Sequence, residues 1–342
     1  MPRDEGILVL IVGQEYPEHI EIDAGSEVRA VTFTANGEYL VGGVRKEVQV
    51  WRVKDGERVA TMKVGDGVWS VAVSKDGRFI AAVSDGGLFV WDATTHEQVF
   101  ADSLVPFFDV DFSPDSTRLV SADSLNNTAT IWDIAARKKV RILDHRESVR
   151  AAKYSPQGDR IATASAKSIR VWDTDDGHLL VNVKVGLSPW PGLLWFNDHL
   201  FVKTQDSKVN QINASTGSLV SGWRVPHEGN SCMALPQHGQ FLAYSTRNNI
   251  TFWDTSTRIQ LGLISRSTNR SSIAFSPSGQ CLALVQQRKI IIKHNFHVKV
   301  RPLLNRFLIL IHTSYTRSRT FILKQLRSVH GKILNSPMQK RY

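Results

Sequence analysis

The sequence predicts an all-β fold in which short antiparallel sheets repeat around a closed ring. Two observations support this prediction. A tryptophan that ends an apolar run recurs at steps of 40 or 41 residues, and aspartate follows four of its five copies. Each interval also contains alternating apolar segments that are separated by turn signals, as in a series of short strands. The five tryptophans are Trp51, Trp91, Trp132, Trp172 and Trp253.

The period continues where the tryptophan is absent. The step from Trp172 to Trp253 is 81 residues, which is two periods, and its midpoint falls at Ile212 in KVNQINASTG. One further step past Trp253 leads to Lys293, which follows a similar apolar run in KIIIK. The chain therefore carries seven marks, and a period of this length indicates a repeat architecture.

Each repeat predicts four short strands. In the second repeat, residues 68–73 (VWSVAV) and 78–83 (RFIAAV) are rich in strand-forming residues, and Asp76-Gly77 marks the turn between them. Residues 88–91 are the third predicted strand, and residues 98–100 begin the fourth. The first strands of five other repeats read VRAVTF, FFDVDF, VRAAKY, SCMAL and SSIAF.

These features resemble those of the WD-repeat β-propeller family over residues 17–294. The resemblance implies a seven-bladed β-propeller of four-stranded antiparallel blades. It also implies that residues 19–23 supply the outermost strand of the seventh blade and so close the ring. Residues 7–12 also have the pattern of the third strand of a blade, and they compete with residues 289–293 for the same place in the ring. An eight-bladed or incompletely closed ring therefore stays open as the alternative.

Burial explains why such sheets repeat. A four-stranded sheet has two apolar faces and covers both of them only by stacking on its neighbours. Burying one large apolar side chain contributes roughly 1.5–3 kcal/mol, so the loss of the tryptophan at Ile212 weakens one seam. The fifth repeat also has a first turn shortened to Asn197-Asp198. We therefore expect the fifth blade to be the least stable.

The family often locks a blade through a hydrogen-bonded set of Asp, His, Ser or Thr, and Trp. Repeat four offers His145, Ser165 and Trp172, but Ala166-Lys167 stands where the turn aspartate is needed. No repeat has the full set, so we expect stability to rest mainly on apolar packing. The other partial sets are Ser84, Asp85 and Trp91 in repeat two, Ser121, Asp123 and Trp132 in repeat three, and His227, Ser245 and Trp253 in repeat six.

One aligned position is a candidate partner-binding ring. It lies where each first strand leaves its loop near the central channel, and in the resembled family this position faces partners. Arginine and aromatic residues dominate binding hot spots, and arginine over an aromatic face suits an acidic or phosphorylated peptide. The alternative is that the aromatic members pack against neighbouring loops. The residues are Arg29, Trp69, Phe108, Arg150, Trp190, Ser231 and Ser271.

The absence of catalytic motifs argues against an enzymatic activity of this chain. No Walker A loop, HExxH or GxSxG is present, and the two cysteines, Cys232 and Cys281, fit neither a disulfide framework nor a zinc site. We expect no catalytic, cofactor-binding or metal-binding residues. The resemblance implies a scaffold that binds proteins or peptides. Two cysteines and no secretion signal favour a cytoplasmic location, with the nucleus as the alternative.

The net charge of +10 lies in one segment. Residues 295–342 hold ten Lys and Arg residues and no acid, which leaves 32 cations and 32 anions in the rest of the chain. We treat this segment as a basic C-terminal tail outside the propeller, disordered or partly helical, with an amphipathic pattern over residues 320–334. It is either a disordered extension, a non-native gene end, or a binder of anionic membrane or nucleic-acid phosphate.

Overall fold

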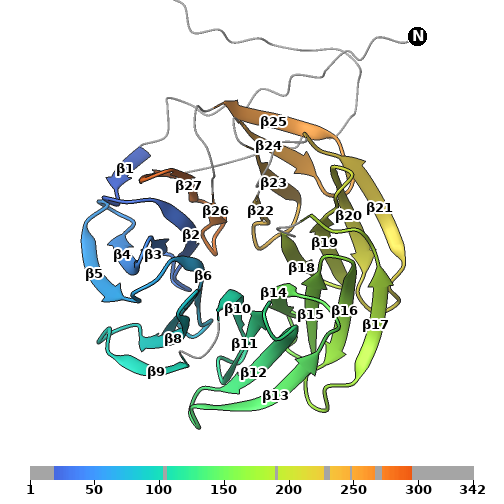
Figure 1. Ribbon diagram of the computed structural model, residues 1–342. Coiled ribbons are helices and arrows are strands. Elements are labelled where there is room, and N and C mark those ends of the chain that lie inside the picture. The colour runs from blue at the N-terminus through green and yellow to red at the C-terminus, as the bar shows by residue number, and fades with distance from the viewer. Residues whose placement is uncertain are drawn as a thin grey trace, which may run out of the picture. The chain divides into compact units, whose positions relative to one another are not determined.

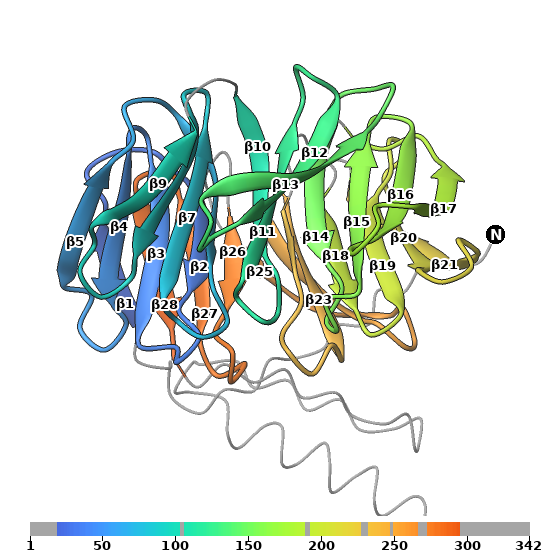
Figure 2. The same ribbon diagram turned by 90° about the horizontal axis from the view of Figure 1, so that it is seen from below.

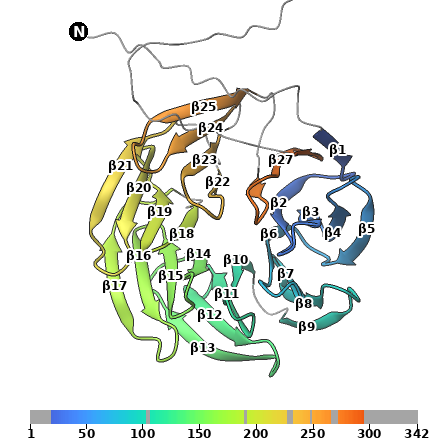
Figure 3. The ribbon, with the colours of Figure 1, turned by 180° about the vertical axis from the view of Figure 1, so that it is seen from behind.

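Seven four-stranded antiparallel sheets make up the described part of the chain in the computed structural model. The structure describes residues 19–102, 106–188, 192–226, 232–246, 249–265 and 272–294. Within these ranges the sheets stand around a common axis, and the same ring is seen from both sides (Figures 1 and 3). The predicted seven-bladed β-propeller is confirmed. The predicted basic tail and residues 7–12 lie outside the described ranges.

Each blade has an innermost, a second, a third and an outermost strand. The innermost strands are β2 (Val28–Phe33), β6 (Val68–Val73), β10 (Phe107–Phe112), β14 (Val149–Tyr154), β18 (Leu193–Phe196), β22 (Met233–Ala234) and β26 (Ile273–Phe275). The second strands are β3 (Tyr39–Val44), β7 (Phe79–Ser84), β11 (Arg118–Asp123), β15 (Arg160–Ser165), β19 (His199–Lys203), β23 (Phe241–Ser245) and β27 (Leu282–Gln286). The third strands are β4 (Glu47–Arg52), β8 (Gly87–Asp92), β12 (Thr128–Asp133), β16 (Ser168–Asp173), β20 (Lys208–Asn213), β24 (Asn249–Asp254) and β28 (Lys289–Lys293). The outermost strands are β5 (Arg58–Lys63), β9 (Gln98–Asp102), β13 (Lys138–Asp144), β17 (Leu179–Lys184), β21 (Leu219–Arg224), β25 (Gln260–Ser265) and β1 (His19–Asp23).

The ring closes between the first and last described strands. Strand β1 pairs antiparallel with β28, from His19 opposite Lys293 to Asp23 opposite Lys289. Ile22 of β1 is buried in a cluster that also contains residues of blade 1 and blade 7. The closing strand predicted at residues 19–23 is therefore confirmed, and main-chain hydrogen bonds join the two distant segments.

Alternating strand directions give the ring two different faces. We call the face at which the innermost strands begin face A, and the opposite one face B; Figure 2 shows the ring from the side. Face A carries the connections between blades and the turns between second and third strands. Face B carries the two other turns of each blade. Side chains at equivalent positions of different blades therefore reach the same face.

The repeated tryptophan fills the seam toward the preceding blade. Trp51, Trp91, Trp132 and Trp172 are all buried, and Trp172 packs among residues of blades 3 and 4. In blade 5, Ile212 takes this place and is buried against alanines and valines of blade 4. The seam between blades 4 and 5 is therefore closed by a smaller side chain than the seam before it.

Blade 4 contains a polar lock that differs from the predicted one. The indole of Trp172 donates to Oγ1 of Thr163 at 2.8 Å, and that hydroxyl lies 2.9 Å from Nε2 of His145. Ser165, predicted for this role, instead donates to the carboxylate of Glu147. In blade 3 the expected pair is present, since Trp132 donates to Ser121 at 2.8 Å. Apolar packing is therefore supplemented by hydrogen bonds in at least two blades.

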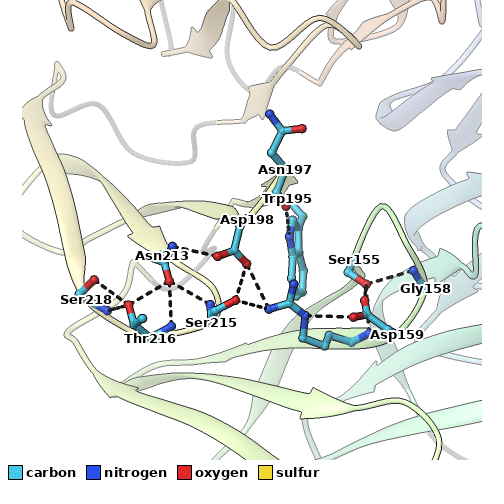
Figure 4. Close-up of polar contacts among 11 residues, drawn as sticks. Ser155, Gly158, Asp159, Trp195, Asn197, Asp198, Asn213, Ser215, Thr216 and Ser218 are labelled. Carbon is cyan, nitrogen blue, oxygen red and sulfur yellow. Dashed lines mark hydrogen bonds and ion pairs between the residues drawn. The ribbon is translucent and has the colours of Figure 1, made fainter.

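A polar network joins blades 4 and 5 on face B (Figure 4). Arg160, at the start of β15, contacts Asp198 at 3.1 Å and donates to Ser215 Oγ at 2.8 Å. Ser215 and Asn213 also donate to the carboxylate of Asp198. Burial raises the pKa of Asp198, but the bonds from Ser215, Arg160 and Asn213 outweigh it and hold that pKa below its usual value. The guanidinium also lies 5.6 Å from the ring centre of Trp195.

Candidate partner-binding surface on face A

Three predicted ring residues lie together at the starts of β2, β6 and β10. The guanidinium carbon of Arg29 lies 4.5 Å from the ring centre of Trp69. The ring of Trp69 lies 5.4 Å from that of Phe108, at an interplanar angle of 33°. All three side chains are half-buried. Blades 1 to 3 thus present a continuous cation–aromatic row on face A, which we call the Arg29–Trp69–Phe108 row.

Turn residues that the sequence did not single out for binding hold this row in place. Trp69 donates its indole N–H to Asp85 at 2.8 Å, and Glu27 lies 3.8 Å from the guanidinium of Arg29. A Cβ at Gly67 would lie 3.0 Å from Nη1 of Arg29, so this glycine leaves room for the arginine. From the sequence, Asp85 was assigned to an ordinary turn and to the partial lock with Ser84 and Trp91, and neither assignment pointed to Trp69.

Positive charge on face A gathers at blade 4. Arg150 takes the position of Trp69 at the start of β14 and is half-buried. Arg146 and Lys167 are exposed on the neighbouring loops. Glu147 lies 3.5 Å from Lys167, and Asp144 is exposed at the end of β13. The three cations Arg146, Arg150 and Lys167 therefore outnumber these two acids by one. The remaining ring residues, Trp190, Ser231 and Ser271, lie outside the described ranges.

A second polar cluster lies on the innermost strands and has a structural role. Lys153 of β14 lies 3.0 Å from Asp109 of β10, which also accepts a hydrogen bond from Ser70 of β6 at 2.9 Å. Asp111 accepts from the backbone N–H of Tyr154 at 2.9 Å. Burial raises the pKa of Asp111 to about 6, against the opposing charge of Lys153. This cluster ties blades 2, 3 and 4 together near the axis.

The Arg29–Trp69–Phe108 row has the residue types that are typical of a partner-binding surface. A stacked arginine and two aromatic rings offer flat apolar area together with charge, which are the usual features of binding hot spots. Cation–π stacking at such sites contributes about 0.5–1 kcal/mol and holds the arginine in place before a partner arrives. Among the described residues, no three His, Cys, Asp or Glu side chains gather as a metal site would require. Within the same residues, no helix is long and apolar enough to cross a membrane.

Comparisons with known proteins found one matching family model and several relatives. The family model described as WD domain, G-beta repeat, matches residues 56–92, 100–133 and 137–173. The chain is 27% identical over 236 residues to apoptotic protease-activating factor 1 of Rattus norvegicus, covering 65% of this chain and 18% of that protein. It is 22% identical to the transcriptional corepressor LEUNIG_HOMOLOG of Arabidopsis thaliana, covering 78% of this chain and 35% of the relative.

For a third relative, the match covers similar shares of this chain and of the relative. The guanine nucleotide-binding protein subunit beta of Solanum tuberosum is 26% identical over 212 residues, which cover 54% of this chain and 53% of the relative. In all three relatives the match spans less than two thirds of their own length.

Proposed function

Because the chain is a WD-repeat β-propeller, we propose that it is a non-catalytic scaffold that binds protein or peptide partners on face A. The observation that carries the proposal is the Arg29–Trp69–Phe108 row, in which residues from three blades share one surface. Each is partly exposed although it is held by its neighbours. A preorganised surface of this kind binds at a smaller entropic cost than a mobile one.

The charge distribution indicates which partners fit. We propose that an acidic or phosphorylated residue of the partner pairs with Arg150, because the loops of blade 4 carry an excess of cations. Glu27 and Asp85 lie beside Arg29 and Trp69, so the other end of the surface favours an apolar or cationic group. A partner segment with opposite charges at its two ends would match both halves.

Comparative co-purification tests this proposal. Full-length protein, Trp69→Ala and Arg150→Glu variants are expressed in cells, and bound proteins are quantified by mass spectrometry. We expect both substitutions to lose the same partners, whereas Lys54→Ala, on an exposed face B turn, retains them. Retention of all partners by both folded variants would refute face A as the binding surface. The proposal places the protein in the cytoplasm or nucleus, which fluorescence microscopy of a tagged chain checks.

The sequence also suggested binding of phosphate, nucleic acid or anionic membrane through residues 295–342. That alternative depends only on the charge of a segment outside the described residues. Salt-sensitive retention on heparin that the Arg150→Glu variant keeps in full would favour it, because the face A cations would then be irrelevant. Loss of retention in that variant would assign the anion binding to the propeller.

A further inference from the structure

A groove runs along the outer part of the seam between blades 4 and 5. It has a volume of about 520 Å³, within the usual range for binding pockets. Blade 5 contributes the side chains on β20 and β21, and the inner end is formed by the blade connection and the turn before β20. These two blades lie next to each other on the perimeter of the ring (Figure 1). The lining residues are Val185, Gly186, Thr204, Gln205, Asp206, Lys208, Asn210, Leu219 and Gly222.

Comparison with the preceding seam explains why this groove is open. In blade 4, Arg170 spans the seam and donates to the carbonyl oxygen of Asp144 at 3.0 Å. Arg170 pairs across the sheet with Asn182. The corresponding pair in blade 5 is Asn210 with Gly222. An arginine and an asparagine are thus replaced by an asparagine and a glycine, so the seam is left unfilled.

The open space is lined by carboxamides suited to a polypeptide main chain. The side chains of Asn210 and Gln205 make no hydrogen bond to any other described residue. A carboxamide both donates and accepts, so it complements the N–H and C=O groups of an extended segment. A Cβ at Gly222 would lie 2.6 Å from Oδ1 of Asn210, so glycine is required for Asn210 to lie across β21.

The two ends of the groove differ in polarity. At the face A end, Lys208 and Arg224 are directly opposite each other on paired strands, an unfavourable arrangement for like charges. Lys208 has an ion pair with Asp206, whereas Arg224 has none within the described residues. At the face B end, Leu219 is 62% exposed and Val220 is 44% exposed. An anion at one end and an apolar group at the other would therefore both be accommodated.

The apolar end is continuous with blade 4. A Cβ at Gly217, in the turn before β21, would lie 2.7 Å from a methyl group of Val181, so the glycine brings this turn against β17. Leu219 and Val220 thus lie at the end of the groove where blade 5 packs against Val181 of blade 4.

We propose that this groove binds an extended segment of a partner protein that carries apolar residues at one end and acidic residues at the other. The apolar residues contact Leu219, the main chain meets Asn210 and Gln205, and the acidic residues pair with Arg224. Strand β21 has six residues, which corresponds to about 20 Å of extended partner chain. Residues 295–342 hold no acid, so Arg224 would repel rather than attract them. This perimeter site shares no residue with the Arg29–Trp69–Phe108 row or Arg150 and does not depend on binding there.

Selection from a random peptide library on phage tests the proposal with the full-length protein. We expect enriched sequences to combine apolar and acidic residues. Synthetic peptides made from them are then measured by fluorescence polarisation. Asn210→Arg places an arginine where blade 4 has Arg170 and is expected to weaken binding at least about tenfold by filling the groove. Arg224→Glu is expected to weaken it about fivefold or more, and Arg224→Lys less than about twofold.

A matched control reverses the same charge elsewhere. Lys63 ends β5 opposite Glu47, the position that corresponds to Arg224 opposite Lys208, and Lys63→Glu should leave binding unchanged. Circular dichroism confirms that each variant is folded. The proposal is overturned if the enriched peptides are basic, or if they bind the Asn210→Arg variant as tightly as the natural chain. It is also overturned if sedimentation shows a dimer that Arg224→Glu dissociates, since a second copy would then occupy the groove.

Discussion

The indole N–H of Trp172 donates to the hydroxyl of Thr163, two residues along from its direct cross-strand partner Ile161. Side chains at diagonal positions on one face of a sheet lie within reach of a long aromatic ring. The same hydroxyl contacts His145 on the loop from the preceding blade. One threonine therefore connects the second strand, the third strand and the inter-blade connection of blade 4.

Replacing this hydroxyl should destabilise the protein measurably. Thr163→Val keeps the shape of the side chain but leaves the buried indole N–H and imidazole without their shared partner. We expect the free energy of unfolding to fall by about 1–3 kcal/mol, the range for a buried polar group that loses its hydrogen bond. Urea denaturation measures the change. Thr163→Ser, which keeps the hydroxyl, should recover most of it, and equal losses in both variants would contradict the assignment.

Blade 4 lacks one member of the lock, and the structure shows the consequence. Nδ1 of His145 is buried with no hydrogen-bond partner. Ala166 directly follows β15, as Asp85 directly follows β7. We expect Ala166→Asp to supply the missing acceptor and to raise the free energy of unfolding by about 1 kcal/mol. Thermal unfolding at pH 7 measures it; Ala166→Asn is the uncharged control, and no gain from either variant would show that the turn cannot reach the imidazole.

The burial of His145 also predicts that the protein becomes less stable in acid. Burial lowers the pKa of His145 from about 6.5 to about 3, with a smaller contribution from the charge of Arg170. Below about pH 6.5 the unfolded chain binds a proton at His145 and the folded chain does not, so acid favours unfolding. The part of the free energy of unfolding that depends on neutral His145 is complete above about pH 6.5 and is lost as the pH falls toward 3. The slope for one proton approaches about 1.4 kcal/mol per pH unit. Urea titrations between pH 7 and 4 measure it.

A variant isolates this histidine from the other titrating groups. His145→Gln cannot titrate, so its stability should depend less on pH than that of the natural chain over the same window. Ala166→Asp should act in the same direction, because a carboxylate beside the imidazole raises its pKa. A pH dependence identical to that of the natural chain in both variants would assign the acid sensitivity to other groups.

The blade order was predictable because it depends on periodicity, and the ring closure was predictable because the resemblance to WD-repeat propellers implies it. Turn signals and alternating apolar residues recur with the repeat, and residues 19–23 remain as an unassigned strand next to the first repeat. Polar partners were not predictable, because Ser165 and Thr163 lie on the same face and only the strand register decides which one Trp172 reaches. The groove beside Asn210 was missed because it results from volume that small residues leave unfilled.

The candidate binding surface was predictable only in part. Aligning first strands identified Arg29, Trp69 and Phe108 because equivalent positions reach the same face. Their supports, Asp85 and Gly67, come from turns whose residues have ordinary local explanations. A turn aspartate shows its second role only when an indole from another strand is seen to donate to it.

Blade 5 should open before the other blades, and the Arg160 network should limit that opening. Ile212 leaves the seam with blade 4 less filled, whereas Arg160 joins the two blades through Asp198 and Ser215 (Figure 4). Hydrogen exchange with mass spectrometry should show the lowest protection in β18 to β21 and uniformly higher protection in blades 1 to 4. Arg160→Leu should remove the contacts and lower protection in blade 5 specifically, with a loss of about 1 kcal/mol, because the Asp198 carboxylate that loses its cation is itself 39% exposed.

Matched variants distinguish a seam effect from general destabilisation. Arg78 directly precedes the second strand of blade 2 and is exposed. Among the interactions of the described residues, its side chain makes no contact with blade 3. Arg78→Leu should therefore leave the exchange of blade 5 unchanged. Ile212→Trp is the complementary change, which should raise protection of blade 5 if the seam accepts the larger ring. Equal protection of all seven blades in the natural chain would contradict the premise that the seam beside Ile212 is weak.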